Sequence, residues 1–302
     1  MRAVALHPDV LLITSAVLQV NCVIVCGPAA REEGEVAGEA DEAAGRGDGG
    51  AVGEAGGAVA EAGGALAGGT RPGETFVIDS PVLPDELDAL PALVAQARFP
   101  APSGLLATHG DWDHLLGRLA FPGVALGCPE STAERLQASP GEAQRELRAF
   151  DEELLIGRDR PLSLGSVQAL AVPGRCGIGD AELELHPADG HTSDGMAIVI
   201  PWARVLIAGD YLSTVELPML SGGGDLEGYL ATLGRLRSLV GGVDQVVPGH
   251  GPVLDRERAL AVLDEDVTYV RALGERGAEA ELPAGRRSKA QRRIHTENVG
   301  AM

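Results

Sequence analysis

One stretch of eleven residues decides the fold: Leu105-Leu106-Ala107-Thr108-His109-Gly110-Asp111-Trp112-Asp113-His114-Leu115. It begins with an apolar run typical of a buried strand and ends with two histidines and two aspartates within six positions. Carboxylates gathered at the end of a buried strand are costly unless a positive charge lies among them. Imidazole and carboxylate groups suit zinc, iron or manganese. The stretch therefore predicts a metal site, with a solvated polar loop as the alternative.

The composition restricts the class of protein. A chain of 302 residues can form one large domain or two ordinary ones, and it lacks the apolar run of about 18 residues that a membrane span requires. A formal charge of −20 repels phosphate backbones, so nucleic acid is not expected as a partner. Four scattered cysteines do not make a disulfide framework. We expect a reduced, cytoplasmic protein that acts on a small molecule, in an oligomeric state that the sequence leaves undetermined.

Residues 29–73 differ from the rest of the chain, because they are almost all Gly, Ala and Glu. They contain a seven-residue repeat, over residues 54–60 and again over 61–67, in which paired glycines oppose a helix. Low complexity and net negative charge predict a disordered insertion that widens a hairpin turn. We therefore expect one domain over residues 1–275 and a solvated, basic C-terminal tail over residues 276–302.

Helices and strands are both predicted along the chain. Helical spacing marks residues 85–98, 226–240 and 256–273. Their mixture with strands implies α/β layers. The strands are expected at residues 10–13, 20–25, 75–78, 105–107, 124–126, 167–172, 183–185, 196–200, 205–207 and 245–247.

Three later segments repeat the pattern of an apolar strand that ends in a metal-ligand type. His191 lies in a Gly-His-Thr sequence, Asp210 follows the apolar residues 205–208 and a glycine, and His250 stands between two glycines. Each segment alone is weak, because Gly-His and Gly-Asp turns occur in many proteins. Together, and in this order after the first cluster, they are a strong signal.

With these pieces the sequence resembles the metallo-β-lactamase-fold hydrolase superfamily. The pattern of that family is His-x-His-x-Asp-His, followed by Gly-His-Thr, Gly-Asp and Gly-His-Gly, and it is matched here by residues 109–114, 190–192, 209–210 and 249–251. The resemblance runs from about Val10 to Leu273, without the Gly-rich insertion. It implies a four-layer αββα sandwich with the site at one edge.

The resemblance also implies the roles of individual residues. Two divalent ions, zinc before iron or manganese, would supply a bridging hydroxide as nucleophile, and Asp113 would orient water and pass a proton to the leaving group. The implied ligands are His109, Asp111 and His191 for one ion, Asp113, His114 and His250 for the other, and Asp210 between them.

Asp111 departs from the family pattern, which has histidine at this position. With three aspartates, two divalent ions and one hydroxide, the charges of the site sum to zero, and the extra carboxylate favours iron or manganese beside zinc. An acidic residue here also resembles flavodiiron proteins, whose redox chemistry would need a separate partner protein. In the alternative interpretation Asp111 points away and only one metal binds tightly.

The most favoured function is hydrolysis of a small ester, thioester or lactone. A flavodiiron-like redox module and a non-catalytic metal-binding protein are the alternatives. Two further predictions concern the surroundings of the site: Asp79 supports a ligand histidine or merely caps its strand, and Asp194 is exposed, with contact to the ligand residues as the alternative. Residues 14–19 are the candidate loop for contact with substrate.

Overall fold

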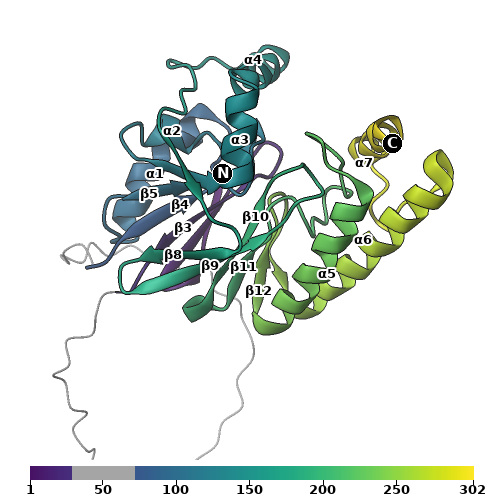
Figure 1. Ribbon diagram of the computed structural model, residues 1–302. Coiled ribbons are helices and arrows are strands. Elements are labelled where there is room, and N and C mark those ends of the chain that lie inside the picture. Colours follow the sequence, from purple (N-terminus) through teal and green to yellow (C-terminus); the bar gives the residue numbers. More distant parts are fainter. Residues whose placement is uncertain (29–71) are drawn as a thin grey trace, which may run out of the picture.

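The computed structural model describes residues 1–28 and 72–302. Two β-sheets face each other, and helices cover the outer face of each (Figure 1). The predicted four-layer αββα sandwich is confirmed. The predicted disordered insertion lies almost entirely outside the described residues.

The first sheet has seven strands in chain order. Its first four strands pair antiparallel, and β4 to β7 pair parallel. The strands are β1 (Arg2–His7), β2 (Val10–Thr14), β3 (Asn21–Cys26), β4 (Thr75–Ile78), β5 (Gly104–Leu106), β6 (Leu126–Pro129) and β7 (Val167–Leu170).

The second sheet has six strands in the order β13-β12-β11-β10-β9-β8, and only β11 and β12 pair parallel. Its edge strand β8 lies next to β9, in a hairpin with a tight turn. The strands are β8 (Gly174–Ile178), β9 (Ala181–Pro187), β10 (Met196–Ile200), β11 (Val205–Ile207), β12 (Gln245–Val247) and β13 (Leu254–Asp255).

Strand β3 shows why the central strands are apolar after their first residue. Cys22 and Ile24 pack toward the helices of the first sheet, whereas Val23 and Val25 pack toward the second sheet. Because side chains alternate between the two faces and both faces are covered, every position after Asn21 is apolar, and the buried Asn21 amide donates to the carbonyls of Pro248 and Gly251. Buried cysteines serve here as small hydrophobic residues.

The helices cover the outer faces of the two sheets. Each uses one apolar stripe, such as Leu87, Leu90 and Val94 in α1, which reach the first sheet. Three short 3₁₀ turns are η1 (Trp112–His114), η2 (Pro201–Ala203) and η3 (Gly277–Glu279). The first sheet is covered by α1 (Pro84–Gln96), α2 (Gly117–Ala120), α3 (Glu130–Ala138) and α4 (Glu142–Leu154), and the second by α5 (Leu226–Gly242) and α6 (Arg256–Arg276).

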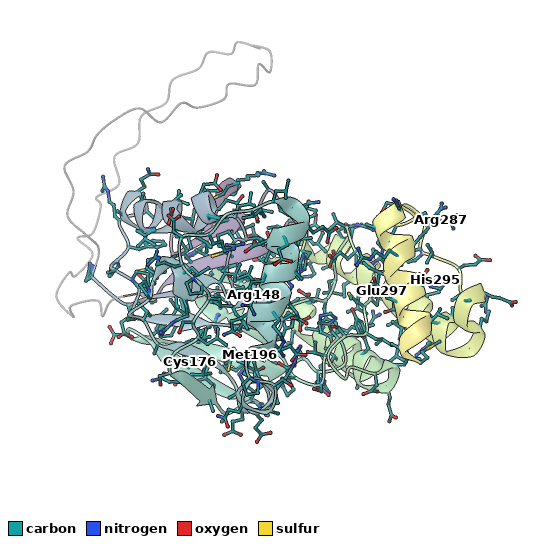
Figure 2. All side chains as sticks on the ribbon, turned by 90° about the horizontal axis from the view of Figure 1, so that it is seen from above. Arg148, Cys176, Met196, Arg287, His295 and Glu297 are labelled. Carbon is teal, nitrogen blue, oxygen red and sulfur yellow. The ribbon has the colours of Figure 1, made fainter. Side chains whose placement is uncertain are left out.

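The C-terminal segment differs from the expected solvated tail. It contains helix α7 (Lys289–Ala301), on which Figure 2 labels His295 and Glu297, with Arg287 just before the helix. Arg286 is buried, with its Nη1 2.6 Å from Asp266 Oδ1. The segment folds back because its buried polar groups find partners: Arg286 also donates to the carbonyl of Ser213.

Within residues 1–28 and 72–302, no helix has the length and hydropathy needed to cross a lipid bilayer.

Candidate metal centre

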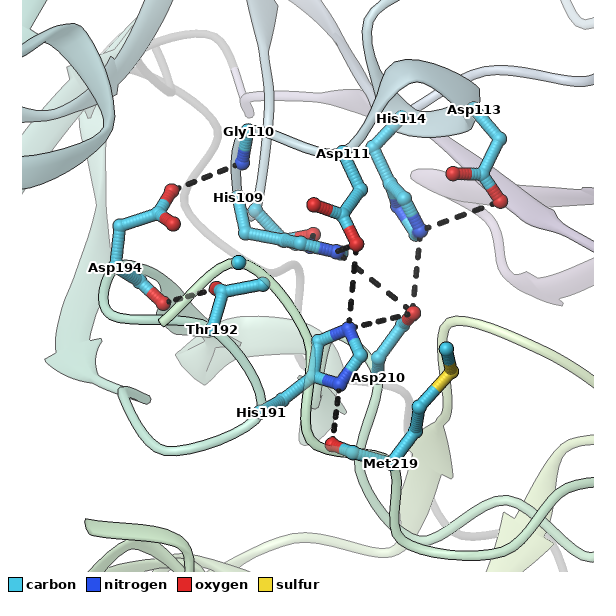
Figure 3. A network of polar contacts seen from close by, with 12 residues as sticks. His109, Gly110, Asp111, Asp113, His114, His191, Thr192, Asp194, Asp210 and Met219 are labelled. Atoms are coloured by element: carbon cyan, nitrogen blue, oxygen red, sulfur yellow. Dashed lines mark hydrogen bonds and ion pairs between the residues drawn. The ribbon is translucent and has the colours of Figure 1, made fainter. Parts of the chain in front are cut away.

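The candidate site lies where several strands of both sheets end. The carboxyl ends of β4 and β5 in one sheet and of β11 and β12 in the other open at this edge, and the turn between β9 and β10 joins them. Seven polar side chains meet there, most of them visible in Figure 3. They are all of the predicted ligands: His109, Asp111, Asp113, His114, His191, Asp210 and His250.

The first group consists of His109, Asp111 and His191. Asp111 Oδ2 lies 3.7 Å from His109 Nε2 and 3.5 Å from His191 Nε2. All three side chains offer ligand atoms within 4.8 Å of one another. The group therefore coincides with the set predicted for the first ion, and Asp111 points into the site.

The second group consists of Asp113, His114 and His250. Asp113 Oδ2 lies 3.5 Å from His250 Nε2 and 3.9 Å from His114 Nε2. All three residues are buried. This group coincides with the set predicted for the second ion.

Asp210 lies between the two groups. Its Oδ2 is 3.4 Å from His191 Nε2 and 3.3 Å from His250 Nε2, and its Oδ1 is 3.2 Å from His114 Nε2. One carboxylate thus reaches histidines of both groups, as a bridging ligand requires.

Main-chain carbonyls orient two of the histidines through their second ring nitrogen. His191 Nδ1 is 2.8 Å from the carbonyl oxygen of Met219, and His250 Nδ1 is 2.9 Å from that of Leu18. Because a carbonyl oxygen only accepts, Nδ1 carries a proton, and in the neutral ring Nε2 directs its lone pair toward the centre.

Asp79, at the end of β4, orients the other two histidines. Its Oδ2 lies 3.1 Å from His114 Nδ1 and accepts a hydrogen bond of 2.9 Å from Thr108 Oγ1. Since Thr108 uses its hydrogen for Asp79, its oxygen can accept from His109 Nδ1, 3.1 Å away. The structure thus places Asp79 in the supporting position that the sequence suggested.

The donor set fits divalent cations. Nε2 of His109, His114 and His191 is buried and makes no hydrogen bond, and neither does Asp210 Oδ1. These atoms have only N···O contacts of 3.2–3.9 Å with one another and with the other carboxylates of the site. Buried polar atoms without partners are costly, so a convergent set of them indicates a missing ligand. Imidazole nitrogens and carboxylate oxygens together are the usual ligands of zinc and related ions.

Without a cation, protons take its place among these groups. Burial by itself lowers the pKa values of His191 and His250, but nearby carboxylates outweigh it and raise them to about 9 and about 10. Burial raises the pKa of Asp210, yet the surrounding histidines hold it well below its usual range. Cation binding would therefore release protons.

The model of the metallo-beta-lactamase superfamily matches residues 71–250 of the sequence. The chain belongs to this superfamily. Membership indicates a metal-dependent hydrolase, and no curated protein sequence matches the chain.

Solved structures of metallo-beta-lactamases share the fold at low identity. One from Pontibacter korlensis has a TM-score of 0.51 and 17% identity, over 87% of this chain and 98% of that one. TMB-1 has a TM-score of 0.53 and 17% identity, over 87% and 95%. DIM-1, in a crystal exposed to ceftazidime, has a TM-score of 0.51 and 15% identity, over 87% and 96%. These similarities concern the fold alone.

Near the centre of this superfamily member, Asp194 is buried, so the favoured prediction that it is exposed is wrong. It is 1% exposed and accepts hydrogen bonds from Gly110 N, Thr132 Oγ1 and Arg135 Nη1, at 2.9, 2.6 and 2.9 Å. It is buried because these three donors satisfy its carboxylate. The bond to Gly110 fixes the loop that carries His109 and Asp111.

A cleft of about 500 Å³ opens beside the centre. Val17 and Leu18 line it, within the loop predicted to contact substrate. Further apolar walls come from several distant elements, and the charged rim carries Glu153, Glu216, Arg293 and Glu297. The apolar wall residues include Trp112, Phe150, Leu154, Leu217, Met219 and Ile294.

Two charged residues near the centre were absent from the sequence analysis. Glu216 Oε1 lies 3.7 Å from His250 Nδ1, and removal from water raises its pKa. Arg135 contacts Asp111 directly. Neither belongs to a recognisable motif, so only the folded chain shows that they belong to the site.

Proposed function

We propose that the protein hydrolyses a small ester, thioester or lactone with the help of two divalent cations, zinc being favoured. The observation that carries this proposal concerns the Nε2 atoms of His109, His114 and His191. They make no hydrogen bond, and all three converge on the carboxylates of the site. Two groups of three ligand types, with Asp210 between them, support a pair of ions.

The residues of the chain and the bound cations would have different roles in the reaction. Bound cations would act as Lewis acids and lower the pKa of water. His109, Asp111 and His191 would hold one ion, and the second group the other. Asp113 would orient the water and move a proton to the leaving group, since its carboxylate lies at the boundary of the site and the cleft.

The cleft supports a small substrate with an apolar part. Its volume of about 500 Å³ lies in the range of small-molecule sites. Trp112 and Phe150, whose ring centroids are 4.7 Å apart, form one wall, so an alkyl or aryl group of the substrate would find apolar contact there. The reacting carbonyl would face the metal-ligand side.

We also propose that the protein is cytoplasmic and does not bind nucleic acid. Cys22, Cys128 and Cys176 are free thiols, which supports a reducing compartment. The net charge of −20 disfavours phosphate backbones.

One observation favours a redox module of the flavodiiron type instead, namely the carboxylate at position 111. That function requires iron and a reductase as partner. It predicts oxygen or nitric oxide consumption that depends on added reductant, and no turnover of esters.

The deciding experiment combines metal analysis with a panel of ester, thioester and lactone substrates. We expect about two metal ions per chain, and turnover that falls at least about 100-fold in Asp113→Asn. His7→Ala, at the end of β1 and outside the cleft lining, serves as the control and should retain activity. A protein that takes up no ions contradicts the proposal, and bound ions without turnover would indicate a non-catalytic metal-binding protein.

A further inference from the structure

Asp111 brings an additional negative charge to the first cation site, and the fold places a cation directly against it. Arg135, in helix α3, donates from Nη2 to Asp111 Oδ1 at 2.7 Å. Both side chains are mostly buried, with 15% and 20% exposed. An ion pair with this degree of burial is more than a surface contact.

Arg135 is itself fixed in place by a second carboxylate. Its Nη1 donates to Asp194 Oδ1 at 2.9 Å, while Asp194 Oδ2 is held by the amide of Gly110 and the hydroxyl of Thr132. The rigid guanidinium therefore spans two carboxylates. Its position relative to Asp111 follows from the chain, because α3 and the loop after β5 are both tied to Asp194.

This arrangement gives the two oxygens of Asp111 different roles. Oδ1 is occupied by Arg135, so only Oδ2 faces Nε2 of His109 and His191. A carboxylate held in this way offers one ligand atom, as an imidazole does. The guanidinium charge, which Asp111 shares with Asp194, also offsets part of the carboxylate charge and so weakens the sequence-based reason to expect harder ions than zinc.

We propose that Arg135 is a positioning residue that lets Asp111 serve where the family pattern has histidine, by fixing one oxygen toward the cation and offsetting part of the added charge. The inference rests on the proposed cation site. It assigns to α3 a part in metal binding that no sequence motif marks.

Zinc affinity of the full-length protein, measured by competition with a chelating dye, tests the proposal. We expect Arg135→Met to bind zinc about tenfold more weakly, the usual scale for loss of a residue that holds a ligand. Arg135→Lys keeps a positive charge and should recover part of the loss. The control is Arg148→Met, an exposed arginine on α4.

A second background separates positioning of Asp111 from general support of the loop. In Asp111→His the guanidinium has no carboxylate to hold, so adding Arg135→Met should change zinc affinity less than about twofold. Asp111→Ala, which has no side-chain acceptor for the guanidinium, replaces that background if Asp111→His does not fold, as judged by thermal unfolding.

The outcomes are distinct. Equal losses in both backgrounds would mean that Arg135 acts only through Asp194, and unchanged or tighter binding by Arg135→Met would also overturn the proposal. A wild-type protein that binds no zinc refutes the proposed function, and this inference with it.

Discussion

At the scale of single residues, the second ring nitrogen of each candidate ligand histidine decides its role. Leu18 O and Met219 O hold two of these nitrogens, and Asp79 holds the others directly or through Thr108. The acceptor for His250 lies 232 positions away in the chain. Motifs could therefore predict the histidines, but most of the acceptors that set their tautomers depend on the tertiary fold.

The raised pKa values of His191 and His250 predict how the cation-free protein responds to pH. Their folded-state pKa values of about 9 and about 10 exceed the value of about 6.5 expected in the unfolded chain. Each protonated histidine thus stabilises the fold fully below about pH 6.5, and this contribution is lost as the pH rises through 9 to 10. We expect the free energy of unfolding to fall over this window, by up to about 1.4 kcal/mol per pH unit for each histidine.

Urea unfolding of chelator-treated protein at a series of pH values measures this effect. The affinity of the protein for the cation should show the opposite trend. It should rise with pH, because protons and cations compete for the same nitrogens. His191→Gln should reduce the slope of the cation-free protein. A stability that is flat or rises between pH 7 and 10 would contradict the interpretation.

At the scale of elements, periodicity predicted α1, α5 and α6 well because each presents one apolar stripe to a sheet. The edge strands β1 and β8 were not predicted, since Ile178 is the one fully buried residue in the two strands and they have no clear apolar pattern. Helix α7 was also missed. Its two buried residues, Gln291 and Asn298, are polar, and a hydrophobic pattern does not reveal them.

Asn298 links α7 to the loop that supports His191. It accepts from Leu220 N at 2.9 Å and donates to the carbonyl of Pro218 at 2.7 Å, on either side of Met219. We expect Asn298→Ala to lower the free energy of unfolding by about 2–3 kcal/mol, because the buried amide and carbonyl lose their partners. Cation affinity should fall as well, since the carbonyl of Met219 orients His191.

Urea unfolding and a zinc titration of the same preparation provide both readouts. Arg292→Ala, an exposed change on the same helix, is the control and should alter neither quantity. If Asn298→Ala behaves like the control, α7 does not support the centre.

The point where the segment between β3 and β4 enters the fold lies away from the site, and a deletion can test this. Cys26 pairs with Thr75 at the end of the hairpin where this segment enters, whereas Ile78 at the other end leads to Asp79 and the centre. At about 3.3 Å per residue, four steps put the entry about 13 Å from Asp79. Deletion of residues 31–70, with a short turn in their place, should therefore leave turnover and zinc affinity within about twofold.

Turnover and zinc affinity of the deletion protein are compared with those of the full chain, after thermal unfolding has shown that the shortened chain folds. A severe loss of turnover in a folded deletion protein would mean that residues 31–70 act on the site.

At the scale of the whole molecule, two stacked sheets explain which parts of the site were predictable. The ligands stand at strand ends, and strand ends share an edge by the rules of sheet topology, so their convergence could be predicted from order and spacing. The cleft walls could not, because α4 and α7 contribute Phe150 and Ile294 from segments nearly 150 positions apart. Substrate preference therefore depends on tertiary packing that the motifs do not encode.

Acidic side chains outnumber basic ones along the cleft. The rim carries Glu153, Glu216 and Glu297 against Arg293 alone, on a chain with net charge −20. Uncharged substrates should therefore be preferred over anionic ones with the same scissile bond, with kcat/KM differing by about tenfold at low salt and by less at high salt, where screening shortens the range of the field. Glu153→Gln should raise kcat/KM for the anionic substrate and leave the uncharged one unchanged, whereas Glu275→Gln, exposed on α6 outside the cleft, should affect neither. An anionic substrate that is turned over as well as its uncharged analogue at low salt would show that the acidic rim does not select.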